Sequence, residues 1–165
     1  ENSMTKVSRY AILASMAALW ACSMDASAQS GKAVEDRHAL MKANGGAVAG
    51  ITAFYKESKG TMADVEKHLA TLQADATKLM GNAEALFPKG TSATDLDSKT
   101  TGAKPDIWMK WDDFKKAAGT FDAETKKLAA TIKGGDKAAI DAAMGGYARN
   151  ACGTCHTPFR GKRDT

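Results

Sequence analysis

Four stretches of the chain place apolar side chains three or four residues apart, the repeat of an α-helix that buries one face. They cover residues 34–59, 61–87, 105–135 and 136–151, and glycine, proline or a capping residue bounds each one. The 165 residues include only three prolines, and alanine and lysine are abundant whereas valine and isoleucine are scarce. Because this composition favours helix over strand, the sequence predicts an all-α protein.

Local signals define the predicted helix ends. Gly60 stops the first helix, and Thr61 with Asp64 can form a capping box that starts the second. Pro105 suits the first turn of the third helix, and Asp136 can cap the fourth. Residues 88–104 are polar and turn-rich, so they form the one long connection. Four amphipathic helices joined in this way predict an up-and-down four-helix bundle.

The first 28 residues have the pattern of a secretory signal peptide, preceded by a short prefix at residues 1–3. Lys6 and Arg9 form a basic start, residues 10–21 are mostly apolar, and a cleavage site follows at residues 26–28. The apolar run is shorter than the roughly 20 residues that span a bilayer. The pattern predicts export to the periplasm, cleavage after Ala28, no permanent membrane span and one domain at residues 29–165. Lipidation at Cys22 is the alternative, against which the better site at Ala28 argues.

The net charge of the chain is +4, and removal of residues 1–28 leaves it unchanged because two basic and two acidic residues leave together. No basic stripe with interleaved aromatic residues is present, which argues against nucleic acid as a partner. A mild positive charge suits docking on an acidic protein face. Cys22 leaves with the signal, so the mature chain retains only Cys152 and Cys155.

These two cysteines belong to the segment Cys152-Gly153-Thr154-Cys155-His156. A pair of cysteines at this spacing also occurs in thioredoxin-like sites, which require a βαβ context that is absent here. A zinc site is a second alternative, with His38 or His68 as a fourth ligand, but adjacent ligands at positions 155 and 156 close poorly around one ion. The histidine directly after the second cysteine is typical of c-type haem attachment. We therefore predict one covalently bound haem c.

The mature chain resembles the c-prime cytochromes, in which the haem motif ends the last helix of a four-helix bundle. The matching features are the haem motif followed by Phe159-Arg160, residues 105–108 at the start of the third helix, and residues 37–45 in the first. The resemblance implies that His156 is the proximal iron ligand. Arg37 and Phe159 belong to the matching features and are further candidate cofactor-binding residues. Trp108 can pack on the haem edge or simply fill the core, and Arg160 can turn back over the proximal face or stay solvated.

The residue that faces the other side of the iron lies, in this family, four positions after an arginine of the first helix. Counting from Arg37 gives Met41, within a run that is similar to the low-spin, methionine-ligated "five-five-six" branch. The resemblance therefore implies that Met41 is the distal ligand, although core filling would also explain a methionine. His38 and His68 are rival ligands. Gly45 and Gly46 suggest close approach of the macrocycle or of another helix.

The predicted function is that of a periplasmic electron carrier with a low-spin haem ligated by histidine and methionine. The alternative is a high-spin protein that binds nitric oxide or carbon monoxide at an open or weakly ligated iron. Peroxidase activity would need polar distal groups, for which Arg37 and His38 are the only nearby candidates. No other catalytic constellation is visible. Family members often pair through their first two helices, so a homodimer is a further expectation.

Overall fold

The computed structural model describes the backbone of residues 4–162 and the side chains of residues 28–162. Its elements are α1 (Met4–Glu57), α2 (Met62–Gly81), α3 (Ala83–Leu86), α4 (Asp106–Met109), α5 (Trp111–Gly134), α6 (Lys137–Tyr147), the π-helix η1 (Ala148–Gly153) and α7 (Thr154–Phe159). Within this described part, the only β-type pairing is an isolated antiparallel bridge between Ala103 and Arg160. The predicted all-α architecture is confirmed.

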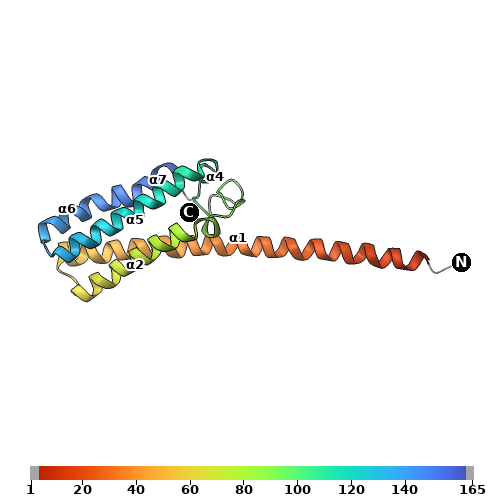
Figure 1. Ribbon diagram of the computed structural model, residues 1–165, viewed down its shortest axis with the longest axis horizontal. Helices are drawn as coiled ribbons and strands as arrows, with labels where there is room; N and C mark the ends of the chain where they lie inside the picture. The colour runs from red at the N-terminus through yellow and green to blue at the C-terminus, as the bar shows by residue number, and fades with distance from the viewer. Residues whose placement is uncertain (1–3, 163–165) are drawn as a thin grey trace.

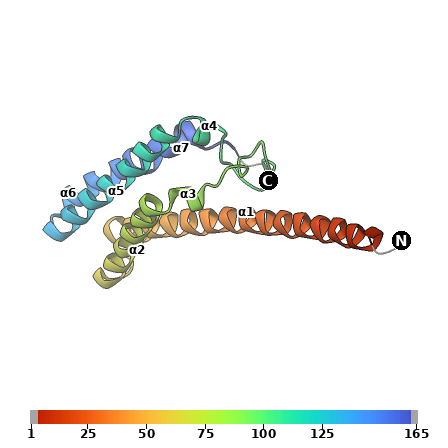
Figure 2. The same cartoon turned by 45° about the vertical axis from the view of Figure 1, so that its right-hand side comes forward.

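The helices form two hairpins that pack into a four-helix bundle. α1 packs against α2, and α5 packs against the line of α6, η1 and α7, while α2·α5 and α1·α6 contacts join the hairpins. Figures 1 and 2 show the two hairpins side by side, with the N-terminal part of α1 extending beyond the bundle. Residues 1–3 and the side chains of residues 4–27 lie outside the described part. The signal peptide and its cleavage after Ala28 therefore stay predictions.

The predicted capping signals are present in the structure. The Thr61 hydroxyl accepts a hydrogen bond from the Asp64 amide at 3.2 Å, and the Asp64 carboxylate accepts one from the Thr61 amide at 2.8 Å. The Thr61 hydroxyl also donates a hydrogen bond to the Asp64 carboxylate at 2.8 Å, and this bond, together with the one from the Thr61 amide, holds the pKa of Asp64 below its ordinary value. Asp136 caps α6 by accepting a hydrogen bond from the Ala139 amide at 2.8 Å. Gly135 ends α5 with a φ of 75°, a backbone conformation that glycine adopts without strain.

Each of the four predicted helices differs from the structure in one respect. α1 begins well before Val34, since its earlier residues are rich in helix formers and lack proline. The predicted second helix is interrupted at Asn82, whose φ and ψ are −129° and 27°, between α2 and α3. The predicted third helix is split at Lys110, whose φ and ψ are −122° and 48°. The predicted fourth helix contains the π-helical turn η1 directly before the haem motif, and such turns are frequent at functional sites.

The core consists mainly of apolar side chains and contains two specific contacts: a pair of buried hydrogen bonds at Thr125, and a close approach of His68 to Gly50. Thr125 donates a hydrogen bond to the Phe121 carbonyl at 2.8 Å, and Tyr147 shares a 2.6 Å hydrogen bond with the same Thr125 hydroxyl. Between α1 and α2, a Cβ atom added to Gly50 would lie 2.1 Å from Nε2 of His68. Gly50 is therefore the glycine that lets the imidazole ring reach the backbone of α1.

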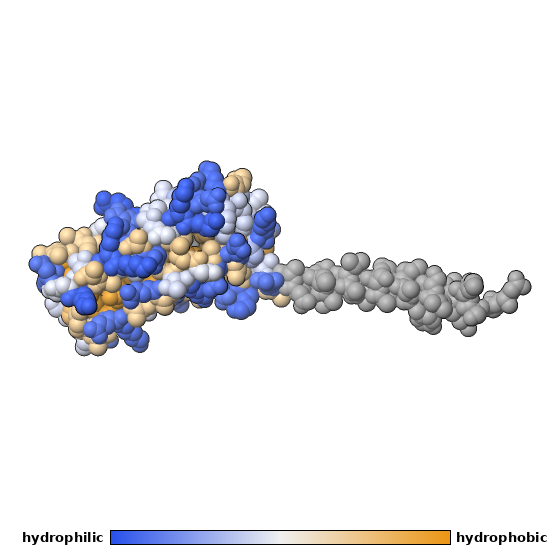
Figure 3. Space-filling view, in the orientation of Figure 1, coloured by the Kyte–Doolittle hydropathy of each residue, from blue (hydrophilic) through white to orange (hydrophobic). Residues whose placement is uncertain are grey.

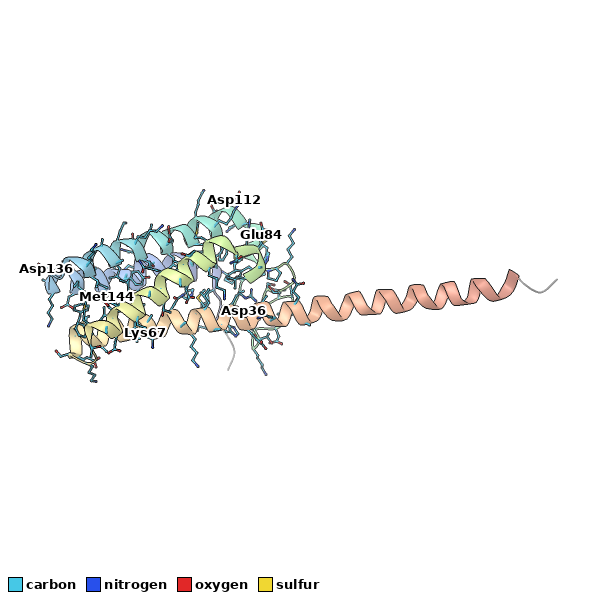
Figure 4. The ribbon with its side chains drawn as sticks, turned by 60° about the horizontal axis from the view of Figure 1, so that its bottom comes forward. Asp36, Lys67, Glu84, Asp112, Asp136 and Met144 are labelled. Atoms are coloured by element: carbon cyan, nitrogen blue, oxygen red, sulfur yellow. The ribbon has the colours of Figure 1, made fainter. Side chains whose placement is uncertain are left out.

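The surface of the bundle is mixed in character. Charged and apolar patches alternate over the face shown in Figure 3. Figure 4 shows Asp136 at the end of the bundle where α5 turns into α6, with Met144 further along α6; Met144 is 7% exposed. In the searched part of the chain, no helix has an apolar stretch long enough to cross a membrane.

Candidate haem site

A cavity of about 930 Å³ lies between α1, the 88–104 connection and the C-terminal helices. Drug-sized and cofactor ligands occupy cavities of about 300–1,000 Å³. Most of its walls come from α1, from the 88–104 connection, and from α5 with η1 and α7. The lining residues are Arg37, His38, Met41, Lys42, Asn44, Gly45, Val48, Leu79, Phe87, Thr101, Gly102, Ala103, Ile107, Phe114, Phe121, Ala151, Cys152, Cys155, His156, Phe159 and Arg160. Distant parts of the sequence thus meet around one space.

Cys152, Cys155 and His156 together line the C-terminal wall of this cavity. All three side chains are half-buried. Burial raises the pKa of Cys155 to about 11 and also raises the pKa of Cys152. Burial and the nearby Arg160 cation lower the pKa of His156. At neutral pH the wall therefore presents two thiols and a neutral imidazole, the form of histidine that binds a metal.

Thiol–disulfide exchange and zinc binding fit this geometry poorly. A thiol–disulfide exchange site lowers the pKa of its attacking thiol, whereas burial raises the pKa of both thiols here. Among the described residues, no three His, Cys, Asp or Glu side chains are grouped as a metal site. Of the two histidines considered as a fourth zinc ligand, His68 packs on Gly50 and does not line the cavity, whereas His38 does line it.

An aromatic cluster supports the C-terminal wall. The ring of Phe114 makes edge contacts with Phe87 and Phe159, at centroid distances of 4.7 Å and 5.4 Å, and stacks on Trp111 at 5.4 Å. Phe114 and Phe159 are both buried and both line the cavity. Phe159, three residues after His156, is therefore anchored by a buried ring of α5 within the cavity wall.

The opposite wall is formed by successive turns of α1. Arg37, Met41, Asn44, Gly45 and Val48 all line the cavity, and their spacing of three or four residues places them on one helix face. Met41 is 36% exposed. A Cβ atom added at Gly45 would meet no protein atom within 4 Å. Gly45 thus borders open space, and the close approach to another helix expected at Gly45 and Gly46 occurs instead at Gly50.

Arg37 is a buried cation at one end of this wall, with a side chain only 5% exposed. Its guanidinium donates to the Thr91 hydroxyl at 3.2 Å and to the Thr91 carbonyl at 3.1 Å, and it lies 4.9 Å from the ring centroid of Phe87. Burial lowers its pKa to about 10. The cavity lining includes Arg37, Lys42 and Arg160 but no aspartate or glutamate, so this space suits a ligand that carries negative charge.

The 88–104 connection is clipped onto the residues that follow the haem motif. The Lys104 amide donates to the Phe159 carbonyl at 3.0 Å, and the Gly161 amide donates to the Gly102 carbonyl at 2.8 Å. The Lys104 ammonium also donates to the Pro158 carbonyl at 2.9 Å. These bonds bring residues 101–103 and Arg160 to the mouth of the cavity, a closure that the sequence did not predict.

The structure brings together most of the predicted site residues. Arg37, Met41, the haem motif, Phe159 and Arg160 surround one cavity, but Trp108 is not among the lining residues. Its indole N–H donates to the Phe87 carbonyl at 2.9 Å, so its contact with a haem edge stays a prediction. His38 is exposed and lines the cavity. Sequence reasoning did not identify Asn44 and Phe114 as site residues. Their positions on the buried faces of their helices were the signal that could have indicated them.

Comparison with known proteins agrees with this arrangement. The family model described as Cytochrome C' matches residues 32–160. A cytochrome c-556 of Agrobacterium tumefaciens (strain B2A) is 33% identical over 133 residues, 79% of this chain and 98% of that protein. A cytochrome c' of Pararhodospirillum photometricum is 32% identical over 130 residues, 77% of this chain and 94% of that protein.

Solved structures show the same fold. A mutant cytochrome c' of Rhodopseudomonas palustris has a TM-score of 0.60 and 34% identity, covering 79% of this chain and 98% of its own. A cytochrome c' described as having a ligand-controlled dimer dissociation has a TM-score of 0.66 and 28% identity, covering 81% and 97%. A helical bundle with a terminal haem motif facing a cavity defines a class II c-type cytochrome. The chain belongs to the cytochrome c' family.

The cofactor of this electron-transport protein is haem c, and the cavity fits it on three counts. The two thiols that form the covalent bonds face the cavity, the lining is largely apolar as a porphyrin requires, and cationic side chains are available for its carboxylates. The open space beside Gly45 provides room on the α1 side.

Proposed function

We propose that the protein is a periplasmic carrier of single electrons with His156 and Met41 as the two axial ligands of its haem. The observation that supports this proposal is that both side chains line one cavity from different helices, α7 and α1. A haem with histidine and methionine ligands exchanges single electrons, and methionine raises its reduction potential.

The residues around the two ligands have distinct roles in this proposal. His156 presents a neutral imidazole because burial and Arg160 lower its pKa. Phe114 and Phe159 are buried, apolar parts of the same lining, and their exclusion of water strengthens the electrostatic interactions inside the cavity. Arg37 and Arg160 supply positive charge toward the haem carboxylates. Arg37 is already oriented for this by Thr91.

The proposal is tested by optical spectra of the oxidised and reduced holoprotein, recorded with and without carbon monoxide. The parent should be low-spin and resist the gas, and Met41→Ala should be high-spin and bind it. Met80→Ala is the matched control, because Met80 is also an exposed methionine, 49% exposed, but does not line the cavity. His38→Ala tests the rival ligand and should leave the spectra unchanged.

The second candidate function is gas binding at a weakly ligated iron. The exposure of Met41 favours it, because a thioether near solvent can leave the iron more readily than a buried one. The same spectra decide between the two functions. A parent protein that is already high-spin and takes up carbon monoxide readily would contradict the electron-carrier proposal.

The redox partner is proposed to present an acidic face that docks on this protein at the mouth of the cavity. Lys42 and Arg160 are both exposed there, and no acidic side chain lines the cavity. Complementary charge accelerates association at low salt, so the rate of electron exchange with an acidic partner should fall as ionic strength rises. Lys42→Gln should reduce that salt dependence, and Lys67→Gln, on α2, should not.

Two further expectations belong to this proposal. The N-terminal sequence of protein from the periplasmic fraction should begin at Gln29. A homodimer would pair copies through α1 and α2, and it is supported by the small residues of α1 and by the dimer of one structural relative. Sedimentation of the holoprotein at several concentrations tests it, since a stable monomer throughout would contradict it.

A further inference from the structure

Asn44 is an unexpected residue in the wall of the cavity. Its side chain is only 8% exposed, it lines the cavity, and its Oδ1 atom is buried without a hydrogen-bond partner. Buried polar atoms in proteins are nearly always hydrogen-bonded, because an unpaired one loses its interactions with water. A carboxamide held in this way indicates a hydrogen-bond partner on the cavity side of α1 in the holoprotein.

The surroundings of Asn44 restrict what this partner can be. The next cavity-lining turn of α1 carries Val48, and Leu79 and Phe121 are further apolar residues of the lining. Arg37 lies seven residues earlier, about 10 Å back along the helix axis, at the end where Thr91 holds it. The anionic groups of a haem belong at that cationic end. The partner of Asn44 is therefore on the side of the axial ligand.

Met41 is the residue nearest to Asn44 in sequence that lies on the same face of α1 and carries a side-chain atom able to accept a hydrogen bond. It precedes Asn44 by three residues, and side chains at this spacing are neighbours on a helix surface. A thioether sulfur is a weak hydrogen-bond acceptor, and a carboxamide has two N–H donors. A half-turn of the Asn44 amide about its last torsion places Nδ2 where Oδ1 lies, so that an N–H can face the sulfur.

We propose that Asn44 is a positioning residue that donates a hydrogen bond from Nδ2 to the Met41 sulfur and restricts the thioether to the iron-facing rotamer. This inference rests on the proposed function, because it assumes that Met41 binds iron. Partners of a ligand side chain commonly change metal affinity by about 10–100-fold when they are removed. Met41, an exposed residue with a long flexible side chain, depends on such a partner more than the half-buried His156 does.

The test compares Asn44→Leu and Asn44→Ala with the parent as holoproteins. Two quantities are measured: the dissociation constant for imidazole, which displaces a weakly held sixth ligand from ferric haem, and the reduction potential. We expect the imidazole dissociation constant to fall about tenfold in both variants. We also expect the reduction potential to fall, because methionine ligation raises it. Asn44→Gln, which keeps the carboxamide, should restore most of both values.

Thr52→Val is the matched control, since it removes a half-buried polar group from the same helix outside the cavity lining, and it should leave both quantities near the parent values. Unchanged imidazole binding and potential in both Asn44 variants would overturn the inference, and so would an equal change in Thr52→Val. A parent protein without a low-spin spectrum would instead overturn the proposed function, and the two failures are thereby distinguishable.

Discussion

The two walls of the cavity are built in different ways. On the C-terminal wall, three chemically active side chains lie within five residues of each other and are supported by a buried aromatic cluster. On the α1 wall, the functional side chains are spread over three turns, and Met41 is 36% exposed. The first wall attaches the cofactor through local chemistry, whereas the second positions its residues through helix periodicity and packing alone.

This difference implies that the two walls respond differently to substitution. Changes on the C-terminal wall should remove the cofactor or destabilise the fold. Changes on the α1 wall should leave an intact protein with altered iron chemistry. The first two of the five predictions below test this division, and the other three test contacts that hold the bundle together; they are given in order of decreasing effect.

The largest effect is expected from replacing both Cys152 and Cys155 by serine. Without the thiols, no thioether bonds can form, and the haem should leave the polypeptide on denaturation or extraction with acidified acetone. The parent should retain its haem under the same treatment. Retention in the double variant would show that attachment is not made by this wall.

Phe114→Ala should strongly destabilise the holoprotein, by about 3–5 kcal/mol, because it removes a buried ring and leaves a void. Phe114 is 3% exposed and contacts three other aromatic rings. Urea denaturation followed by circular dichroism measures the loss. The matched change on the other wall, Val48→Ala, should cost clearly less because Val48 is only half-buried. Equal losses would contradict the proposed division between the walls.

Thr125→Val should cost about 1–3 kcal/mol, because it leaves the buried Tyr147 hydroxyl without its 2.6 Å partner. Tyr147→Phe should cost less, since Thr125 keeps its bond to the Phe121 carbonyl. Chemical denaturation of both variants tests this order. A larger loss in Tyr147→Phe would mean that ring packing, and not the hydrogen bond, dominates here.

The same pair predicts an alkaline pH dependence. Burial raises the pKa of Tyr147 from 10.0 to about 12, so the folded state binds the proton more tightly than the unfolded state. The stabilisation from Tyr147 is therefore complete below pH 10 and is lost as the pH rises toward 12. Tyr147→Phe should show a smaller loss of stability than the parent across this interval.

The smallest effect is expected at the turn between α1 and α2, where Thr61 caps α2. Thr61→Ala removes a helix cap and should cost about 1 kcal/mol, with unchanged haem spectra. Hydrogen bonds from Thr61 lower the pKa of Asp64 from 3.8, so the stabilisation from the capping box is present above that pH and is lost as the pH falls below it. Thermal unfolding at neutral and acidic pH should show the variant losing less than the parent on acidification.

Much of this arrangement could be predicted because its signals are local. The capping box at Thr61 and Asp64, the Asp136 cap and the end of α5 at Gly135 all depend on residues within one helical turn. The haem motif is local as well. The family resemblance added Met41, which apolar periodicity alone could not separate from a methionine that fills the core.

Other features could not be predicted because they depend on long-range packing. Periodicity identified a buried face of α1 but not which of its residues border empty space, so Asn44 and the contact of Gly50 with His68 were missed. The clip between residues 102–104 and 158–161 joins segments more than fifty residues apart. The hydrogen bond of Trp108 to Phe87 likewise required the two hairpins to be docked.

By itself, the sequence determined the helical class, the capped helix ends at Thr61, Gly135 and Asp136, and the attachment chemistry, because propensity, capping and the spacing of two cysteines act between neighbouring residues. Only the tertiary structure decided that Met41 and His156 border the same cavity, that a buried cation lies at one end, and that the carboxamide oxygen of Asn44, one turn from Met41, lacks a hydrogen-bond partner. The physical reason is that a helix repeat specifies a face, whereas the packing of four helices decides what that face meets.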